Sequence, residues 1–247
     1  MNSPIRLSKS SFIRGTKCMK SLWLHFNQPE ERDETSESQQ QIFDTGHSVG
    51  ALAQQRFPEG IDASRGEPWK IQEAAEYTQE LIRSGQEVIY EAAFVTPKSP
   101  EGDLNNKSQF ASVPSQGDLL CYMDILVKED DGWAAYEVKA STGVKESHLL
   151  DVAFQYLVIT GSGLPLKRIS LVHLNNQYVR RGELDLEQIF TIEPITETVL
   201  AMQQKILELL SPLQGSFKSS TKNDSRLSCV LFKGFNSIIQ NPVSNFF

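Results

Sequence analysis

Two carboxylates and a lysine stand near one another in the segment 119–139, and their types suggest metal-assisted chemistry. Asp124 lies in a run of strand-forming residues, and Glu137 and Lys139 lie in a second, shorter run of the same kind. Residues 129–132, Glu-Asp-Asp-Gly, separate the two runs, and Asp and Gly tolerate the backbone dihedral angles of a tight turn. The segment therefore predicts a β-hairpin that carries all three charged side chains.

The register of this hairpin decides how the three side chains face one another. A four-residue loop over 129–132 places Asp124 directly opposite Glu137, whereas a two-residue loop at Asp131-Gly132 places it opposite Lys139. Because side chains alternate between the two faces of a strand, both registers leave the three on one face. A three-residue loop would break this phase unless a bulge restored it.

Two opposed carboxylates on a sheet repel each other, and a bound cation removes that repulsion where the face is partly buried. Mg²⁺ or Mn²⁺ suits this position, because such hard cations bind one or two carboxylates together with waters and a phosphate. A lysine two residues beyond the glutamate could steady a metal-activated water or the phosphate. The arrangement therefore favours hydrolysis of phosphodiester bonds.

The spacing D-x12-E-V-K matches the pattern of the PD-(D/E)xK nucleases. Together with further segments, it resembles the RecB-type branch of that superfamily, close to the CRISPR-associated exonucleases of that type. The chain is most similar to an uncharacterised bacterial family whose N-terminal half is such a nuclease domain. The matching segments run in family order over about residues 7–210: Leu7-Ser8-Lys9-Ser10, the Cys18 region, and residues 43–50, 90–94, 124–127, 137–142 and 151–156.

The resemblance implies a fold, an activity and a set of site residues. The fold is α/β, a restriction-endonuclease-like mixed β-sheet flanked by helices, and the activity is metal-dependent, exonuclease-like hydrolysis of DNA. Asp124 and Glu137, with Glu91 assisting, would hold Mg²⁺ or Mn²⁺. Lys139 would position the attacking water or neutralise the developing charge, and Gln155 would hold the phosphate or the lysine.

Each of these residues also has a purely structural interpretation. Asp124 and Glu137 could be surface carboxylates, Lys139 a solvated partner of Asp124, Glu91 an edge-strand carboxylate and Gln155 part of a neutral helix face. The chain would then be a catalytically degraded nuclease fold that binds nucleic acid or a protein. A third alternative is a fragment whose chemistry lies in a lost C-terminal domain.

The sequence departs from the family pattern at two places near the site. RecB-type helices carry Q-x-x-x-Y, but Ile159 stands where the tyrosine is expected after Gln155. Many relatives have a metal-binding histidine four residues after a helix glycine, and after Gly46 that position is Gly50. The neighbouring His47 is therefore a weak candidate for a ligand.

Three cysteines cannot supply the four thiolates of an iron–sulfur cluster, so we expect no cluster. Cys18 stands where iron–sulfur relatives have their first cluster ligand, but with Cys121 it is predicted to be a small buried residue.

Hydrophobic periodicity places the remaining elements around this segment. Strands are expected over 87–95 and 168–179, a loop over 98–116, and helices over 8–26, 40–57, 68–84, 145–160 and 196–210. Gly46 and Gly50 lie four residues apart, so one face of the second helix lacks side-chain bulk and allows another element to approach closely. His148, Asp151 and Gln155 form a polar stripe on the fourth helix. The nuclease domain is assigned to 1–213, and a truncated or disordered tail to 214–247.

Composition limits the partners and the location. A formal net charge of −7 argues against a general nucleic-acid binder, so DNA would need a local basic patch. The candidates for it are Lys139, Lys145, Lys167, Arg168, Arg180 and Arg181. No apolar run approaches the ~20 residues needed to cross a membrane, and no signal peptide is recognisable, so a cytoplasmic protein is expected. There is no P-loop, so unwinding would require a helicase or another repair or defence partner.

Overall fold

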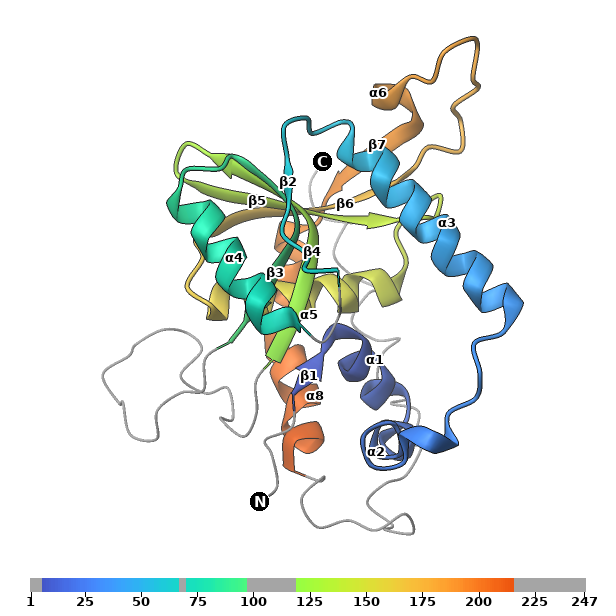
Figure 1. Ribbon diagram of the computed structural model, residues 1–247, viewed down its shortest axis with the longest axis vertical. Helices are drawn as coiled ribbons and strands as arrows, with labels where there is room; N and C mark the ends of the chain where they lie inside the picture. The colour runs from blue at the N-terminus through green and yellow to red at the C-terminus, as the bar shows by residue number, and fades with distance from the viewer. Residues whose placement is uncertain (1–5, 67–69, 97–118, 216–247) are drawn as a thin grey trace, which may run out of the picture.

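A mixed sheet of seven strands forms the centre of the computed structural model, which describes residues 6–66, 70–96 and 119–215 (Figure 1). The strands, in order across the sheet, are β2 (Ile61–Asp62), β3 (Val88–Val95), β4 (Leu119–Glu129), β5 (Gly132–Lys139), β6 (Leu166–Leu174) and β7 (Phe190–Pro194). The short β1 (Leu7–Ser8) pairs with β4 in parallel, and β2–β3 and β5–β6 are also parallel. The other neighbours are antiparallel, which confirms the expected α/β class with a mixed sheet.

Helices flank this sheet on both faces. They are α1 (Lys9–Lys17), α2 (Met19–Asn27), α3 (Glu37–Gln54), α4 (Ile71–Arg83), α5 (Glu146–Gly161), α6 (Leu186–Ile189), α7 (Thr196–Ala201) and α8 (Gln203–Gly215), with a 3₁₀ turn at η1 (Pro29–Glu31). α5 packs on β3, β4 and β6, and α1, α7 and α8 pack on α5. Ala53 of α3 packs with Ile125 on the other face. None of the helices in the described ranges is long and apolar enough to cross a membrane.

The predicted helix over 8–26 is in fact two helices. The backbone is extended at Cys18, with φ −159° and ψ 110°, and this residue ends α1 and begins α2. Gly15 lies at the contact between them, since a Cβ there would meet side-chain atoms of Leu22 at 2.6 Å and of Leu213 at 2.7 Å. The absence of a side chain at position 15 thus lets α1 approach both α2 and α8.

The helix predicted over 40–57 is α3. It starts at Glu37, earlier than predicted, because Ser36 and Gln39 form a capping box. Its apolar side chains Ile42 and Phe43 are 69% and 54% exposed. No described atom of another element lies within 4 Å of a Cβ built on Gly46 or Gly50, so nothing described approaches that face closely.

The other helices and strands agree with the prediction more closely. α4 ends at Arg83, and Gly85, the expected cap, has φ +86°. Gln86 N–H donates to the carbonyl of Leu81 in a Schellman motif. β6 ends at Leu174 and not at 179, because Asn175 starts a turn through a bond from Gln177 N–H to its side chain.

The last predicted helix is divided into α7 and α8. The proposed boundary at 213/214 falls within α8. The predicted loop over 98–116 and residues 216–247 of the predicted tail lie outside the described residues.

Candidate active site

The hairpin of β4 and β5 has the register in which Asp124 and Glu137 are opposed. The ladder runs from Ile125–Tyr136 to Glu129–Gly132 around a turn at Asp130-Asp131, which is shorter than the loop considered for that register. Beyond Tyr136, β5 continues along β6 and leaves β4. Asp124 lies where the two strands separate, and its Oδ2 accepts a hydrogen bond from Val138 N–H at 2.6 Å.

β3 and β4 are both irregular at the same level. Their ladder pairs Tyr90 with Ile125 and Ala92 with Met123, and it omits the intervening pair of Glu91 and Asp124. Glu91 has φ +49°, a left-handed conformation that is uncommon outside glycine. The two carboxylates therefore lie on adjacent strands at a shared interruption of the sheet.

This interruption breaks the strict alternation of side chains that was predicted for the hairpin strand β4, and it has the same effect in β3. Core residues on either side of it belong to one cluster: Ile89 and Ala92 on β3, and Met123 and Leu126 on β4. The phase therefore shifts by one residue at Glu91 and at Asp124. As a result, the residues that face the core are even-numbered on one side of the interruption and odd-numbered on the other. A strand with strict alternation of side chains would not show this change.

Glu137 is the most enclosed charge of the cluster, with only 2% of its surface exposed. Its Oε1 accepts hydrogen bonds from Lys9 Nζ at 2.7 Å and Lys139 Nζ at 2.9 Å, and its Oε2 accepts one from Gln155 Nε2 at 2.7 Å. Burial by itself would raise the pKa of Glu137, but the ammonium groups of Lys9 and Lys139 outweigh it and lower this pKa to about 2. The side chain is therefore an anion at neutral pH.

Helix α5 supplies the partners that fix these groups. Lys139 Nζ also lies 2.7 Å from Asp151 Oδ2, and Gln155 Nε2 also donates to the carbonyl of Tyr122 at 2.8 Å. Burial would lower the pKa of Lys139, yet the carboxylates of Glu137 and Asp151 raise it. The predicted polar stripe of α5 thus faces the hairpin through Asp151 and Gln155, and Lys139 is not a solvated partner of Asp124.

Burial and neighbouring carboxylates raise the pKa values of both Asp124 and Glu91. Burial and the charge of Glu137 raise the pKa of Asp124 to about 7. Burial and the charge of Asp124 raise the pKa of Glu91 to about 8, with Asp62 and Glu137 adding to the effect. The structure therefore brings together all five predicted site residues: Asp124, Glu137, Glu91, Lys139 and Gln155.

Sequence reasoning missed two members of the cluster. Lys9 reaches Glu137 from a position 128 residues away, and no periodicity or spacing pointed to it. The segment around Lys9 was part of the family resemblance, which was the one available signal. Asp151 could have been identified, because it shares the helix stripe with Gln155.

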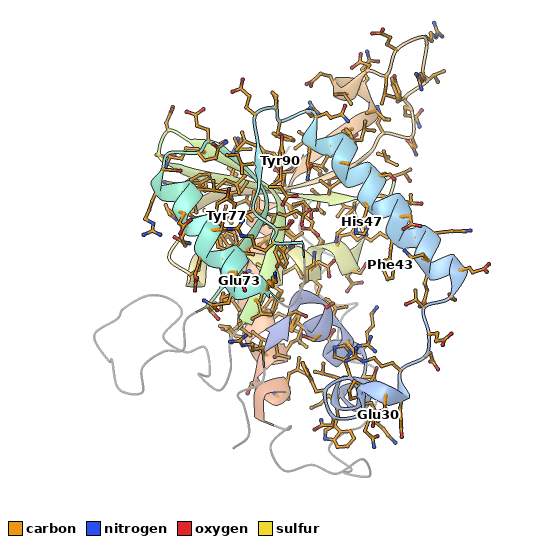
Figure 2. The ribbon with its side chains drawn as sticks, viewed as in Figure 1. Glu30, Phe43, His47, Glu73, Tyr77 and Tyr90 are labelled. Carbon is orange, nitrogen blue, oxygen red and sulfur yellow. The ribbon has the colours of Figure 1, made fainter. Side chains whose placement is uncertain are left out.

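Other candidates lie away from the cluster or differ from expectation. His47 is exposed on α3, where it projects beside Phe43 (Figure 2). Cys121 is buried as predicted, but Cys18 is only half-buried, and its Sγ accepts a hydrogen bond from Ser21 N–H at 3.3 Å. Cys18 therefore caps α2 and does not fill the core.

The predicted basic patch is divided between the two ends of β5. Lys167 pairs with Asp131 at 2.8 Å and Arg168 pairs with Glu129, both at the hairpin turn. Lys139 lies at the opposite end of the strand, within the carboxylate cluster. Because the parallel pairing of β5 and β6 fixes this separation, the six basic residues do not form one surface.

The donor atoms of this cluster suit a divalent cation held by two carboxylates. Asp124 bonds Val138 N–H through Oδ2, and Glu137 Oε2 receives a single bond from Gln155, so each side chain retains lone pairs. The buried Oε1 of Gln155 has no hydrogen-bond partner among the described residues. Within the same residues, no three His, Cys, Asp or Glu side chains form a group that could hold a metal ion. Mg²⁺ needs only one or two carboxylates, since waters complete its shell.

Comparison with known proteins does not identify a family for the chain. No protein-family model matches it, and no curated protein matches it. Among solved structures, the crystal structure of SSO0001 is similar over 86% of this chain and 76% of its own, with a TM-score of 0.39 and 9% identity. A similarity this weak identifies neither a family nor an activity.

Proposed function

We propose that the chain is a metal-dependent nuclease that hydrolyses DNA phosphodiester bonds at the cluster around Glu137. The contacts of this side chain support the proposal most directly. Glu137 is a buried carboxylate that accepts hydrogen bonds from Lys139 on its own strand and from Gln155 on α5. Asp124 adjoins it where β4 and β5 separate. These residue types, in this order, match the PD-(D/E)xK pattern, and a restriction-endonuclease-like sheet is part of the proposal.

The carboxylates of Asp124 and Glu137 would hold Mg²⁺ or Mn²⁺, with Glu91 as an additional ligand or as an acceptor for a bound water. Such a cation, when bound, lowers the pKa of a coordinated water and stabilises negative charge on the phosphate. The charge of Glu137 raises the pKa of Asp124, and the charge of Asp124 raises the pKa of Glu91, so the three carboxylates repel one another in the absence of a cation; this repulsion is the physical reason for a cation to bind here.

The neighbouring side chains would position the reacting groups and neutralise the charge that develops on them. Lys139 is fixed between Glu137 and Asp151, so its ammonium is held ready to donate to the attacking water or to a phosphate oxygen. Gln155 ties Glu137 to the carbonyl of Tyr122 and so sets the orientation of the carboxylate. Donors fixed in advance within a buried site stabilise developing charge more strongly than mobile donors in water do.

The finer aspects of this function come from the family resemblance. It favours exonuclease-like action on DNA, and a cytoplasmic location is part of the proposal. A separate helicase, or another repair or defence protein, would supply any unwinding.

The alternative is a catalytically degraded nuclease fold that binds nucleic acid or a protein. One observation favours it: Lys9 and Lys139 already neutralise Glu137, so this carboxylate does not need a metal for compensation. In that case neither Mg²⁺ nor Mn²⁺ binds at the hairpin.

The decisive experiment is digestion of single- and double-stranded DNA with Mn²⁺ or Mg²⁺, together with Asp124→Asn and Lys139→Met. Lys167 and Asp131 provide the matched controls, because this exposed ion pair lies at the other end of the same hairpin. We expect both site variants to lose about 100-fold or more of the activity, and Lys167→Met and Asp131→Asn to retain it. No digestion by the wild type, together with no heat on titration of Mn²⁺, would favour the binding module.

A further inference from the structure

Lys9 enters the cluster from the N-terminal segment, and three contacts fix its position. Ser8 pairs with Leu120 in the parallel ladder of β1 and β4. The side chain of Ser8 caps α1 through a bond from Ser11 N–H at 3.3 Å. Phe12, one turn further along α1, stacks on Phe154 of α5 with ring centroids 4.6 Å apart. None of these contacts involves the Lys9 side chain, so its position at the start of α1 does not depend on its charge.

The two ammonium groups of the cluster are held differently. Lys9 Nζ and Lys139 Nζ both lie within hydrogen-bond distance of Glu137 Oε1. Lys139 is also bonded to Asp151, so two carboxylates retain it. For Lys9, Glu137 Oε1 is the one hydrogen-bond acceptor within the described residues. Because an ammonium carries three donors, Lys9 retains N–H groups for a further acceptor.

Lys9 is also the more accessible of the two. Its side chain is 28% exposed, whereas that of Lys139 is 18% exposed. Lys9 has no hydrogen bond to Asp151, so a second acceptor can bind its ammonium without displacing that carboxylate, whereas at Lys139 the carboxylate occupies a donor. An ammonium is a compact positive charge, and the phosphate oxygens of a nucleic acid are strong acceptors for it.

We propose that Lys9 is a second phosphate-binding lysine of this site and contacts the scissile phosphate of bound DNA beside the two carboxylates. The inference rests on the proposed nuclease function. Lys139, retained by Asp151, would keep its place next to Glu137. Once Glu137 shares its negative charge with a divalent cation, its attraction for Lys9 falls, and a phosphate oxygen becomes the stronger acceptor.

The test measures both DNA binding and cleavage for Lys9→Met, Lys9→Arg and the wild type. Binding of a labelled single-stranded oligonucleotide is followed by fluorescence anisotropy with Ca²⁺ over a range of salt concentrations, and a gel checks that the oligonucleotide remains intact. Cleavage with Mn²⁺ gives kcat and KM. Lys17→Met is the matched control, because Lys17 is an exposed lysine of the same helix.

We expect Lys9→Met to weaken binding about 10-fold, the loss typical of one charge-assisted hydrogen bond. The slope of log K against log salt should fall by about 0.7, which corresponds to one lost phosphate contact on a single strand. Lys9→Arg should stay within about 3-fold of the wild type, because it keeps the charge. Lys17→Met should match the wild type in both affinity and slope.

The outcomes separate this inference from the proposed function. If the wild type cleaves and Lys9→Met keeps wild-type affinity, slope and kinetics, then Lys9 is only a partner of Glu137 and the inference is overturned. If the wild type neither binds nor cleaves DNA, both proposals fail. If the wild type binds without cleaving and Lys9→Met loses affinity and slope, the nuclease proposal fails alone. If Lys9→Met does not fold, Lys9→Gln decides by the same criteria, because it removes the charge and keeps a donor for Glu137.

Discussion

The carboxylate of Asp124 accepts a hydrogen bond from the backbone N–H of Val138, with Oδ2 2.6 Å from the nitrogen. This bond lies just beyond the last ladder pair of β4 and β5, so a side chain replaces a bond between strands. A buried backbone N–H requires a partner, and here that partner is a candidate metal ligand. The shape of the sheet and the chemistry of the cluster therefore depend on the same side chain.

The two roles of Asp124 can be separated by substitution. Asp124→Asn retains an oxygen for Val138 N–H and removes the charge, so stability should be unchanged or higher while DNA cleavage falls by about 100-fold or more. Asp124→Ala leaves Val138 N–H without a partner and should also cost about 1–3 kcal/mol of unfolding free energy. Urea unfolding and a cleavage assay measure the two effects. Equal stability of the two variants would contradict the role of the Val138 bond.

The pH dependence of stability should reveal the buried charge of Asp124. Its pKa rises from the ordinary 3.8 to about 7 in the folded protein, which means that the folded state favours the protonated carboxyl. The resulting contribution to the free energy of unfolding is complete below pH 3.8 and is lost as pH rises through about 7. Glu91 acts in the same direction between 4.5 and about 8. Glu137 acts in the opposite direction, because its pKa is lowered to about 2 and its contribution disappears as pH falls from 4.5.

Urea unfolding in EDTA from pH 4 to pH 8 tests this expectation, with Asp124→Asn as the reference protein. The difference between wild type and variant reports the titration of Asp124 together with its effect on the pKa of Glu91, and the other titrating groups largely cancel. We expect the wild type to lose stability relative to the variant as pH rises. A constant difference across this range would show that Asp124 has an ordinary pKa.

Gln155 should affect both stability and activity. Its amide is the shared donor for the carbonyl of Tyr122 and for Glu137, so Gln155→Leu should cost about 1–3 kcal/mol and lower cleavage about 10- to 100-fold. Gln203 offers a matched control, because its amide also donates to two carbonyls, those of Ala153 and Val199. Gln203→Leu should lose stability without a comparable loss of kcat. Parallel losses of kcat in both variants would mean that Gln155 acts only through the fold.

Asp151 should act on cleavage through Lys139. Asp151→Asn removes the charge that holds the Lys139 ammonium 2.7 Å away, and we expect cleavage to fall about 10- to 100-fold. Steady-state kinetics should show the change mainly in kcat, since a loosely held lysine still leaves the DNA-binding surface intact. Asp131→Asn, which removes the partner of Lys167, serves as the control. Unchanged kcat in Asp151→Asn would exclude a positioning role for Asp151.

Local sequence signals were sufficient to predict the hairpin and part of the cluster. Turn-forming residues between two runs of strand formers indicate the hairpin, because turn dihedral angles and side-chain alternation are properties of a few adjacent residues. The helical spacing of Asp151 and Gln155 likewise placed both on one face of α5. The carboxylate–lysine pattern and the stripe were therefore visible without any knowledge of the fold.

Tertiary structure alone decided how the cluster is completed. The shift of phase at Glu91 and Asp124 arises because two neighbouring strands are interrupted at the same level, which neither strand shows by itself. Lys9 reaches Glu137 because β1 pairs with β4 and Phe12 stacks on α5, contacts between segments far apart in the chain. Short-range patterns report bonding within a segment, whereas the partners of a buried charge depend on which segments the packed core brings together.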